Sequence, residues 1–122
     1  MTRWLIWGGF AVAWTVILLL PGSEYDRAGF DEVSFTVKAW ITKSGHVLCY
    51  ALFAVLTGWL RVPARYRWAP LFLIMTHATV TELIQYRFPA LARTGCLEDV
   101  CLNDAGILLG LSIGWKWWTD PK

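Results

Sequence analysis

The chain has 122 residues and a net charge of +2 at pH 7, and 57% of its residues are hydrophobic, nine of them tryptophans. This length suits a single domain, residues 1–122, but a soluble domain so small would not need this much apolar surface. The low net charge and the lack of a basic stripe or nucleic-acid motif exclude nucleic acid as the expected partner. The composition predicts an all-α integral membrane protein.

Four apolar segments each approach the roughly 20 residues that an α-helix needs to cross a bilayer. They are residues 4–20, 47–60, 69–86 and 100–118. The first follows Arg3, is long, and has no small-residue cleavage site after it, so we expect a retained helix rather than a signal peptide. The second is the shortest, and a re-entrant or core segment is its alternative. The prediction is a bundle of four transmembrane helices.

The connection between the first two segments has a helical pattern of its own. Its apolar residues recur at i, i+4, i+7 and i+8, as Val33, Val37, Trp40 and Ile41. This spacing places them on one face of a helix. We therefore expect a short helix at the outer membrane interface, which leads through residues 43–45 into the second span.

The charges of the connections predict the topology. The connection between the second and third segments carries Arg61, Arg65 and Arg67 and no acidic residue. Under the positive-inside rule this connection faces the cytoplasm. Both termini are then cytoplasmic, and the other two connections face outward.

Polar residues gather toward the outer ends of three predicted spans. They are Lys43, His46 and Tyr50 in the second, Glu82 and Gln85 in the third, and Asp99 and Asn103 in the fourth. At about 1.5 Å of rise per residue their depths agree within several ångströms. Arg93 follows in the outer connection. Because a charged side chain inside a bilayer costs about 2.5–3.5 kcal/mol on insertion scales, such groups favour a functional site over a structural clamp of ion pairs.

Glycines continue the polar face of the fourth segment. Gly106 and Gly110 share this face with Asp99 and Asn103. Small residues four apart allow another helix to approach closely, so we assign both glycines to helix packing.

The polar residues also carry a resemblance. Lys-x-x-His-x-x-x-Tyr at residues 43–50 is similar to the first signature of the VanZ-like membrane protein family. Glu-x-x-Gln, followed by Arg-x5-Asp-x3-Asn-x2-Gly-x3-Gly, is similar to the second and is met by residues 82–110. Cys96 stands where the family often has a small hydroxyl residue, and Asp104 adds an acid beside the asparagine.

This resemblance implies a small multi-pass protein of the bacterial inner (cytoplasmic) membrane, because the founding member is associated with resistance to the glycopeptide antibiotic teicoplanin. The first functional hypothesis is the binding of an envelope lipid, a lipid-linked precursor or a glycopeptide at the outer polar cluster. In it, Lys43 and Arg93 would pair with phosphate or carboxylate groups. The second is a membrane-embedded enzyme with Glu82, His46 and Asp99 as catalytic candidates. The third is a structural or partner-binding subunit.

No cofactor is expected. A metal site formed by His46, Glu82 and Asp99 is conceivable, but the chain has only two histidines and neither a pair of them on one helix nor a His-Glu-x-x-His motif. We therefore expect no metal. A disulfide between Cys96 and Cys101 and the oligomeric state are left open by the sequence.

Overall fold

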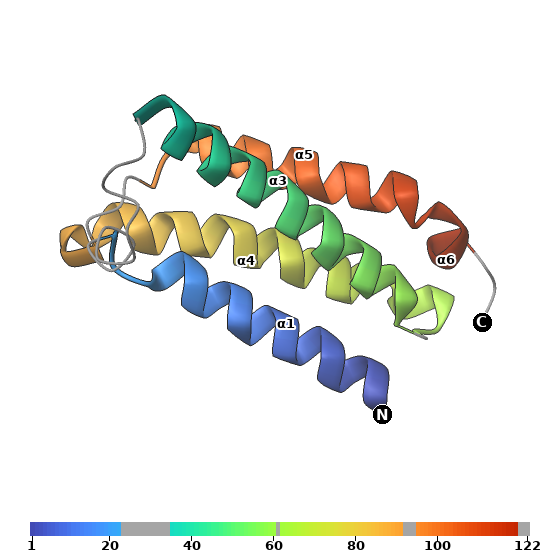
Figure 1. Ribbon diagram of the computed structural model, residues 1–122. Helices are drawn as coiled ribbons and strands as arrows, with labels where there is room; N and C mark the ends of the chain where they lie inside the picture. The colour runs from blue at the N-terminus through green and yellow to red at the C-terminus, as the bar shows by residue number, and fades with distance from the viewer. Residues whose placement is uncertain (23–34, 61, 92–94, 120–122) are drawn as a thin grey trace.

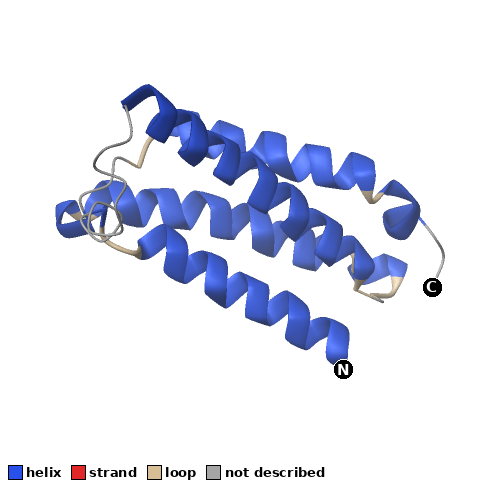
Figure 2. Cartoon of the chain, in the orientation of Figure 1, coloured by secondary structure: helices blue, strands red, loops and turns tan. Residues whose placement is uncertain are grey.

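The computed structural model describes residues 1–22, 35–60, 62–91 and 95–119. Its long helices are α1 (Thr2–Leu19), α3 (Phe35–Trp59), α4 (Trp68–Arg87) and α5 (Leu97–Ile113). The short elements are the 3-10 turns η2 (Ala64–Tyr66) and η3 (Pro89–Leu91) and the helix α6 (Trp115–Thr119). The described residues include no strand, which confirms the all-α prediction (Figure 2).

The four long helices run in alternating directions along one bundle (Figure 1). The end of α1, the start of α3, the end of α4 and the start of α5 therefore lie at one end of the bundle. The opposite end holds the start of α1, the connection between α3 and α4, and α6. The polar residues that the sequence assigns to span ends thus share one end of the molecule.

Helices α3 and α5 form the most extensive contact in the bundle. A Cβ atom on Gly106 would lie 2.4 Å from the carbonyl oxygen of Val47, and one on Gly110 would lie 2.2 Å from that of Ala51. Real Cβ atoms do not approach backbone oxygens so closely. The two glycines therefore allow the backbones of α3 and α5 to touch, which is the packing role that the sequence predicts for them.

The separate interfacial helix that the sequence predicts before the second span is not present. Helix α3 instead runs without a break from Phe35 through residues 43–45 to Trp59. One glycine in a helix costs about 1 kcal/mol, which is not enough to stop a helix whose neighbouring turns are formed. A Cβ atom on Gly45 would meet no neighbour, so nothing packs there to turn the chain. Val33, which began the predicted apolar face, lies outside the described residues.

The fourth predicted segment is also divided differently. Helix α5 ends at Ile113, and Gly114 caps it by donating its N–H to the carbonyl of Gly110 at 2.9 Å. The chain then enters α6, so Gly114 does not continue the glycine face of α5. Helix α6 brings Trp118 against Gly58 of α3, where an added Cβ would lie 2.5 Å from the indole nitrogen.

The interior of the bundle is small and aromatic. Its buried residues include Trp14, Leu18, Tyr50, Phe53, Ile74 and Ile107. Large apolar side chains are nevertheless exposed on all four long helices, among them Leu5 and Val12, Leu48 and Leu52, Phe72 and Leu83, and Leu108 and Ile113. The bundle therefore has an apolar exterior as well as an apolar core.

Two helices are long and apolar enough to cross a membrane: Thr2–Leu19 and the part of α3 from Val37 to Trp59. A core helix of a soluble protein can pass the same test, but such a helix is mostly buried. Here only 11% and 28% of the two apolar windows are buried inside the bundle. These two helices are compatible with a membrane location.

Candidate functional site

Two polar side chains meet where α3 and α5 touch. His46 is 3% exposed and Asn103 is fully buried, and the Nδ1 atom of His46 lies 2.8 Å from Oδ1 of Asn103. They can meet because Gly106, one turn beyond Asn103, lets the helices approach. The pair is a hydrogen bond in which the imidazole N–H donates to the amide oxygen. The amide nitrogen Nδ2 of Asn103 is buried without a hydrogen-bond partner among the described residues.

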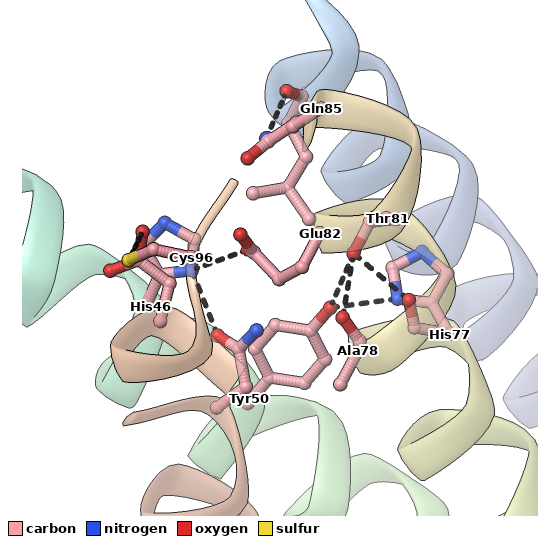
Figure 3. Close-up of polar contacts among 11 residues, drawn as sticks. His46, Tyr50, His77, Ala78, Thr81, Glu82, Gln85 and Cys96 are labelled. Atoms are coloured by element: carbon pink, nitrogen blue, oxygen red, sulfur yellow. Dashed lines mark hydrogen bonds and ion pairs between the residues drawn. The ribbon is translucent and has the colours of Figure 1, made fainter. Parts of the chain in front are cut away.

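The carboxylate of Glu82 reaches the same pair from α4. Glu82 is 3% exposed, and its Oε1 lies 3.7 Å from Nδ1 of His46 (Figure 3). Neither carboxylate oxygen has a hydrogen-bond partner in the part of the chain that the structure describes. A buried polar group without a partner costs about 1–3 kcal/mol, and more when the group is charged. The burial of Glu82 therefore costs free energy, and packing alone does not explain why a carboxylate lies at this position.

Asp99 completes the cluster from the first turn of α5. One ligand atom each of His46, Glu82 and Asp99 lie within 4.8 Å of one another, and Asp99 is only half-buried. The exposed Cys96 donates its thiol hydrogen to Oδ2 of Asp99 at 3.2 Å. Burial, together with the nearby Asp99 carboxylate, raises the pKa of the Cys96 thiol, so this thiol remains a donor at neutral pH. We call His46, Glu82, Asp99 and Asn103 the outer cluster.

Lys43 lies in α3 one turn before His46, but its charge is already paired. Its ammonium group donates to the Oε1 atom of Glu98, the residue before Asp99, and both side chains are exposed. The sequence analysis missed Glu98 as a partner. The signal was present, since two consecutive acids open α5 and one of them must face away from the cluster.

Tyr50 belongs to a different network. Its hydroxyl lies 2.9 Å from Nδ1 of His77 and 3.4 Å from the hydroxyl of Thr81 (Figure 3). The other ring nitrogen of His77, Nε2, lies 2.8 Å from the hydroxyl of Thr15 on α1. His77 therefore links α1, α3 and α4 by packing hydrogen bonds, whereas Tyr50 makes no hydrogen bond to the outer cluster. We call Tyr50, His77, Thr15 and Thr81 the inner network.

Gln85 is also held by a structural contact. It is buried, and its amide nitrogen donates to the carbonyl oxygen of Leu18 at 2.7 Å. That carbonyl belongs to the last turn of α1, where no partner remains within the helix. Gln85 therefore caps α1, and the structure does not show a hydrogen bond from it to the outer cluster.

Arg93 and the three cysteines are the other residues that the sequence analysis singled out. Arg93 lies outside the described residues. Cys49, Cys96 and Cys101 are all free, so the structure contains no disulfide between the last two.

The opposite end of the bundle is basic. Arg3 donates to the carbonyl oxygen of Trp59 at 2.8 Å and lies over its ring, with 4.7 Å between the guanidinium carbon and the ring centroid. Arg65 stacks in the same way on Tyr66. Arg67 donates to the carbonyls of Val62 and Trp118. These three arginines and the outer cluster therefore occupy opposite ends of the bundle.

Comparisons of the chain with protein-family models, with curated proteins and with solved structures find no match. The likeness to VanZ-like proteins therefore stays a prediction from the two motifs. The described polar residues of the motifs divide among a partly unsatisfied cluster, a hydrogen-bonded network, an exposed ion pair and a helix cap.

Proposed function

We propose that the chain is a four-span membrane protein of the bacterial inner membrane that binds the polar head group of an envelope molecule at the outer cluster. In this proposal it is VanZ-like and lowers susceptibility to glycopeptide antibiotics. The observation that carries the proposal is Glu82: a buried carboxylate without a hydrogen-bond partner, at the meeting point of three helices. A carboxylate in a low-dielectric interior is retained more readily for a ligand than for stability.

Membrane crossing by α4 and α5 is supported by their exposed surfaces. Phe72 on α4 and Ile113 on α5 are 70% and 68% exposed, and they have apolar neighbours on the same helices. Soluble monomers rarely expose apolar surface over all sides of a bundle. Since α4 and α5 are packed alongside two helices that are apolar enough to cross, the lipid that surrounds α1 and α3 would surround them too.

The distribution of charge supports an orientation with both termini in the cytoplasm. Arg3, Arg65 and Arg67 lie at the end of the bundle where the N-terminus lies, and the outer cluster lies at the other. The positive-inside rule then places the basic end in the cytoplasm and the cluster outside.

The orientation can be tested with the exposed Cys96 in spheroplasts. A membrane-impermeant maleimide should label Cys96 in intact spheroplasts. With all native cysteines replaced by serine, Arg65→Cys should be labelled only after the membrane is disrupted. Labelling of position 65 in intact spheroplasts would reverse the orientation and move the cluster to the cytoplasmic side.

The chemistry of the described cluster restricts the ligand. It offers two carboxylates, an imidazole and an amide, while the nearby Lys43 is already paired with Glu98. An anionic head group would meet repulsion from Glu82 and Asp99. The bound species must therefore bring hydrogen-bond donors or positive charge to the carboxylates, or a cation must accompany it.

The function can be tested by comparing Glu82→Gln with Asp104→Asn, an acid on α5 outside the cluster. The chain is expressed in a glycopeptide-susceptible bacterium, and the minimum inhibitory concentration of teicoplanin is measured beside the amount of protein in the membrane. We expect the wild type and Asp104→Asn to raise this concentration severalfold and Glu82→Gln to have no effect at equal abundance. An equal effect of Glu82→Gln would remove the cluster from the function.

The presence of His46 and Glu82 side by side also favours the enzymatic alternative, because an imidazole and a carboxylate with their atoms 3.7 Å apart could act as an acid and a base on one bound substrate. Purified protein incubated with lipid-linked envelope precursors separates the two. Saturable binding without product supports a binding protein, and product formation that Glu82→Gln abolishes supports an enzyme.

A further inference from the structure

We propose that His46, Glu82 and Asp99 form a binding site for a divalent transition-metal ion, with Zn²⁺ as the first probe. Their ligand atoms lie within 4.8 Å of one another, and Nδ1 of His46 lies 3.7 Å from Oε1 of Glu82. Two ligands that bind one ion at about 2.0–2.2 Å are separated by roughly 3–4 Å, so one ion between the three groups requires only small side-chain movements.

The donor set indicates which ion fits. Imidazole nitrogen favours zinc and the other late first-row ions over Mg²⁺ and Ca²⁺, and carboxylate oxygens complete such sites. Oδ1 of Asn103, hydrogen-bonded to Nδ1 of His46 at 2.8 Å, is a further oxygen beside these three ligand atoms. The sequence analysis considered His46, Glu82 and Asp99 as ligands and expected no metal, because each of the three comes from a different helix. Spacing along the chain reveals metal motifs on one helix, but not these.

Glu82 supplies an independent reason for a cation. Both of its oxygens lack a hydrogen-bond partner among the described residues, although only 3% of the residue is exposed. A clamp would satisfy the carboxylate with N–H or O–H donors, as the inner network satisfies its own groups. A second carboxylate, Asp99, adds repulsion rather than relief. A divalent ion neutralises both charges and replaces the missing donors.

An ion can reach the outer cluster from the surface of the protein. Asp99 is half-buried and the neighbouring Cys96 is exposed, so the cluster meets the surface at the start of α5. An ion arriving there would meet Asp99 first and then Glu82 and His46. A ligating Nδ1 carries no proton, so the neutral imidazole of His46 would bind the ion as its Nε2–H tautomer.

This inference deepens the proposed function and rests on it for the role of the ion. A bound divalent ion would cancel the two negative charges of the acidic cluster and leave an open coordination position. That position could accept a phosphate or carboxylate of an envelope head group, which the carboxylates alone would repel. Metal binding itself can be measured without any lipid.

The test uses the full chain, purified in detergent and stripped with a chelator that is then removed. Isothermal titration with Zn²⁺ should show one equivalent bound. Glu82→Gln and Asp99→Asn should each weaken binding at least tenfold, by analogy with the loss that even supporting residues cause. Asp104→Asn should bind as the wild type does.

Three outcomes would overturn the site. One is no saturable uptake by the wild type, and another is equal affinity in Glu82→Gln. The third is loss of uptake in a Cys96→Ser/Cys101→Ser variant with no effect of Glu82→Gln, which would assign the ion to exposed thiols. Melting curves guard against misfolding: Zn²⁺ should raise the Tm of the wild type and of Asp104→Asn, but not that of Glu82→Gln.

Head-group binding is measured separately, with and without chelator. Binding of lipid-linked precursor that chelator abolishes supports the role of the ion. Precursor binding that persists in chelator supports the proposed function and rejects the role of the ion. Zinc binding without any precursor binding retains the metal site and rejects the proposed function.

Discussion

The outer cluster on α3, α4 and α5 and the inner network on α1, α3 and α4 share two helices but are satisfied to different degrees. In the inner network the Thr15 hydroxyl donates to the carbonyl of Ala11, so it must accept from Nε2–H of His77. Nδ1 of His77 is then an acceptor, and Tyr50 donates to it. Every group of this chain of bonds has a partner when His77 is neutral.

The outer cluster, in contrast, leaves three buried atoms unpartnered among the described residues: both carboxylate oxygens of Glu82 and the amide nitrogen of Asn103. Hydrogen bonds between membrane helices are formed readily, so a cluster that serves only to hold helices together would be expected to be completed. The comparison teaches that burial and polarity do not identify a site by themselves. The outer cluster has buried polar atoms without hydrogen-bond partners, which a ligand could supply. The inner network has none among its side chains, and it holds α1, α3 and α4 together.

The largest effect on stability should come from the inner network. His77→Leu removes the bonds to Tyr50 and Thr15 and leaves the tyrosine hydroxyl buried with only the long contact to Thr81. We expect a loss of about 1–3 kcal/mol in the free energy of unfolding. Detergent melting curves measure it. An unchanged Tm would show that these bonds do not stabilise the bundle, and the inner network would then not be a structural counterpart of the outer cluster.

The change in the free energy of unfolding caused by Glu82→Gln should have the opposite sign. Glutamine keeps the shape of the side chain, removes a buried charge and adds donors near Asn103, so in metal-free protein we expect an unchanged or slightly higher stability, by up to about 1 kcal/mol. A structural clamp predicts instead a loss of about 3–5 kcal/mol, because His46 would lose a charged partner. The melting curve of this variant in the presence of chelator therefore decides between clamp and site.

Tyr50→Phe probes a single bond of the inner network. The ring keeps its packing against Trp14 and Phe53, and the change removes only the donor to His77. We expect a loss of about 0.6 kcal/mol, the average for a hydrogen bond between membrane helices. The double variant with His77→Leu should lose less than the sum of the two single losses, since they share this bond. Additive losses would mean that the two side chains are not coupled.

Lys43→Gln should have the smallest effect. Its ion pair with Glu98 is exposed on both sides, and exposed pairs contribute little to stability. We expect no measurable change in Tm and no change in zinc affinity. A loss of zinc affinity similar to that of Glu82→Gln would extend the outer cluster to the surface pair.

The sequence predicts the depth of the polar residues along the helices better than it predicts which groups they contact. The depth argument placed His46, Glu82 and Asn103 together because it uses only helix direction and rise, and the structure brings these three into contact. Gln85 and Tyr50 have the predicted depth but different partners. Their partners depend on the rotation of each helix about its axis, which depth does not determine.

Helix α1 shows why those partners could not be found. It is apolar on all sides, so its sequence does not indicate which face meets the bundle. The partner of Gln85 on α1 is the backbone carbonyl of Leu18, and any residue could have supplied it. Thr15 was a weak signal, as one of the few polar residues within α1, yet its hydroxyl also bonds within its own helix.

The contact of Gly106 and Gly110 with the backbone of α3 has a consequence for biogenesis. Helix α3 leaves the ribosome well before α5. In the proposed membrane bundle, the face of α3 that carries Val47 and Ala51 would therefore lack its main partner while the earlier helices insert, and His46 would have neither Asn103 nor Asp99 beside it. The outer cluster would then be completed only near the end of synthesis, and a chain that stops before α5 would never assemble it.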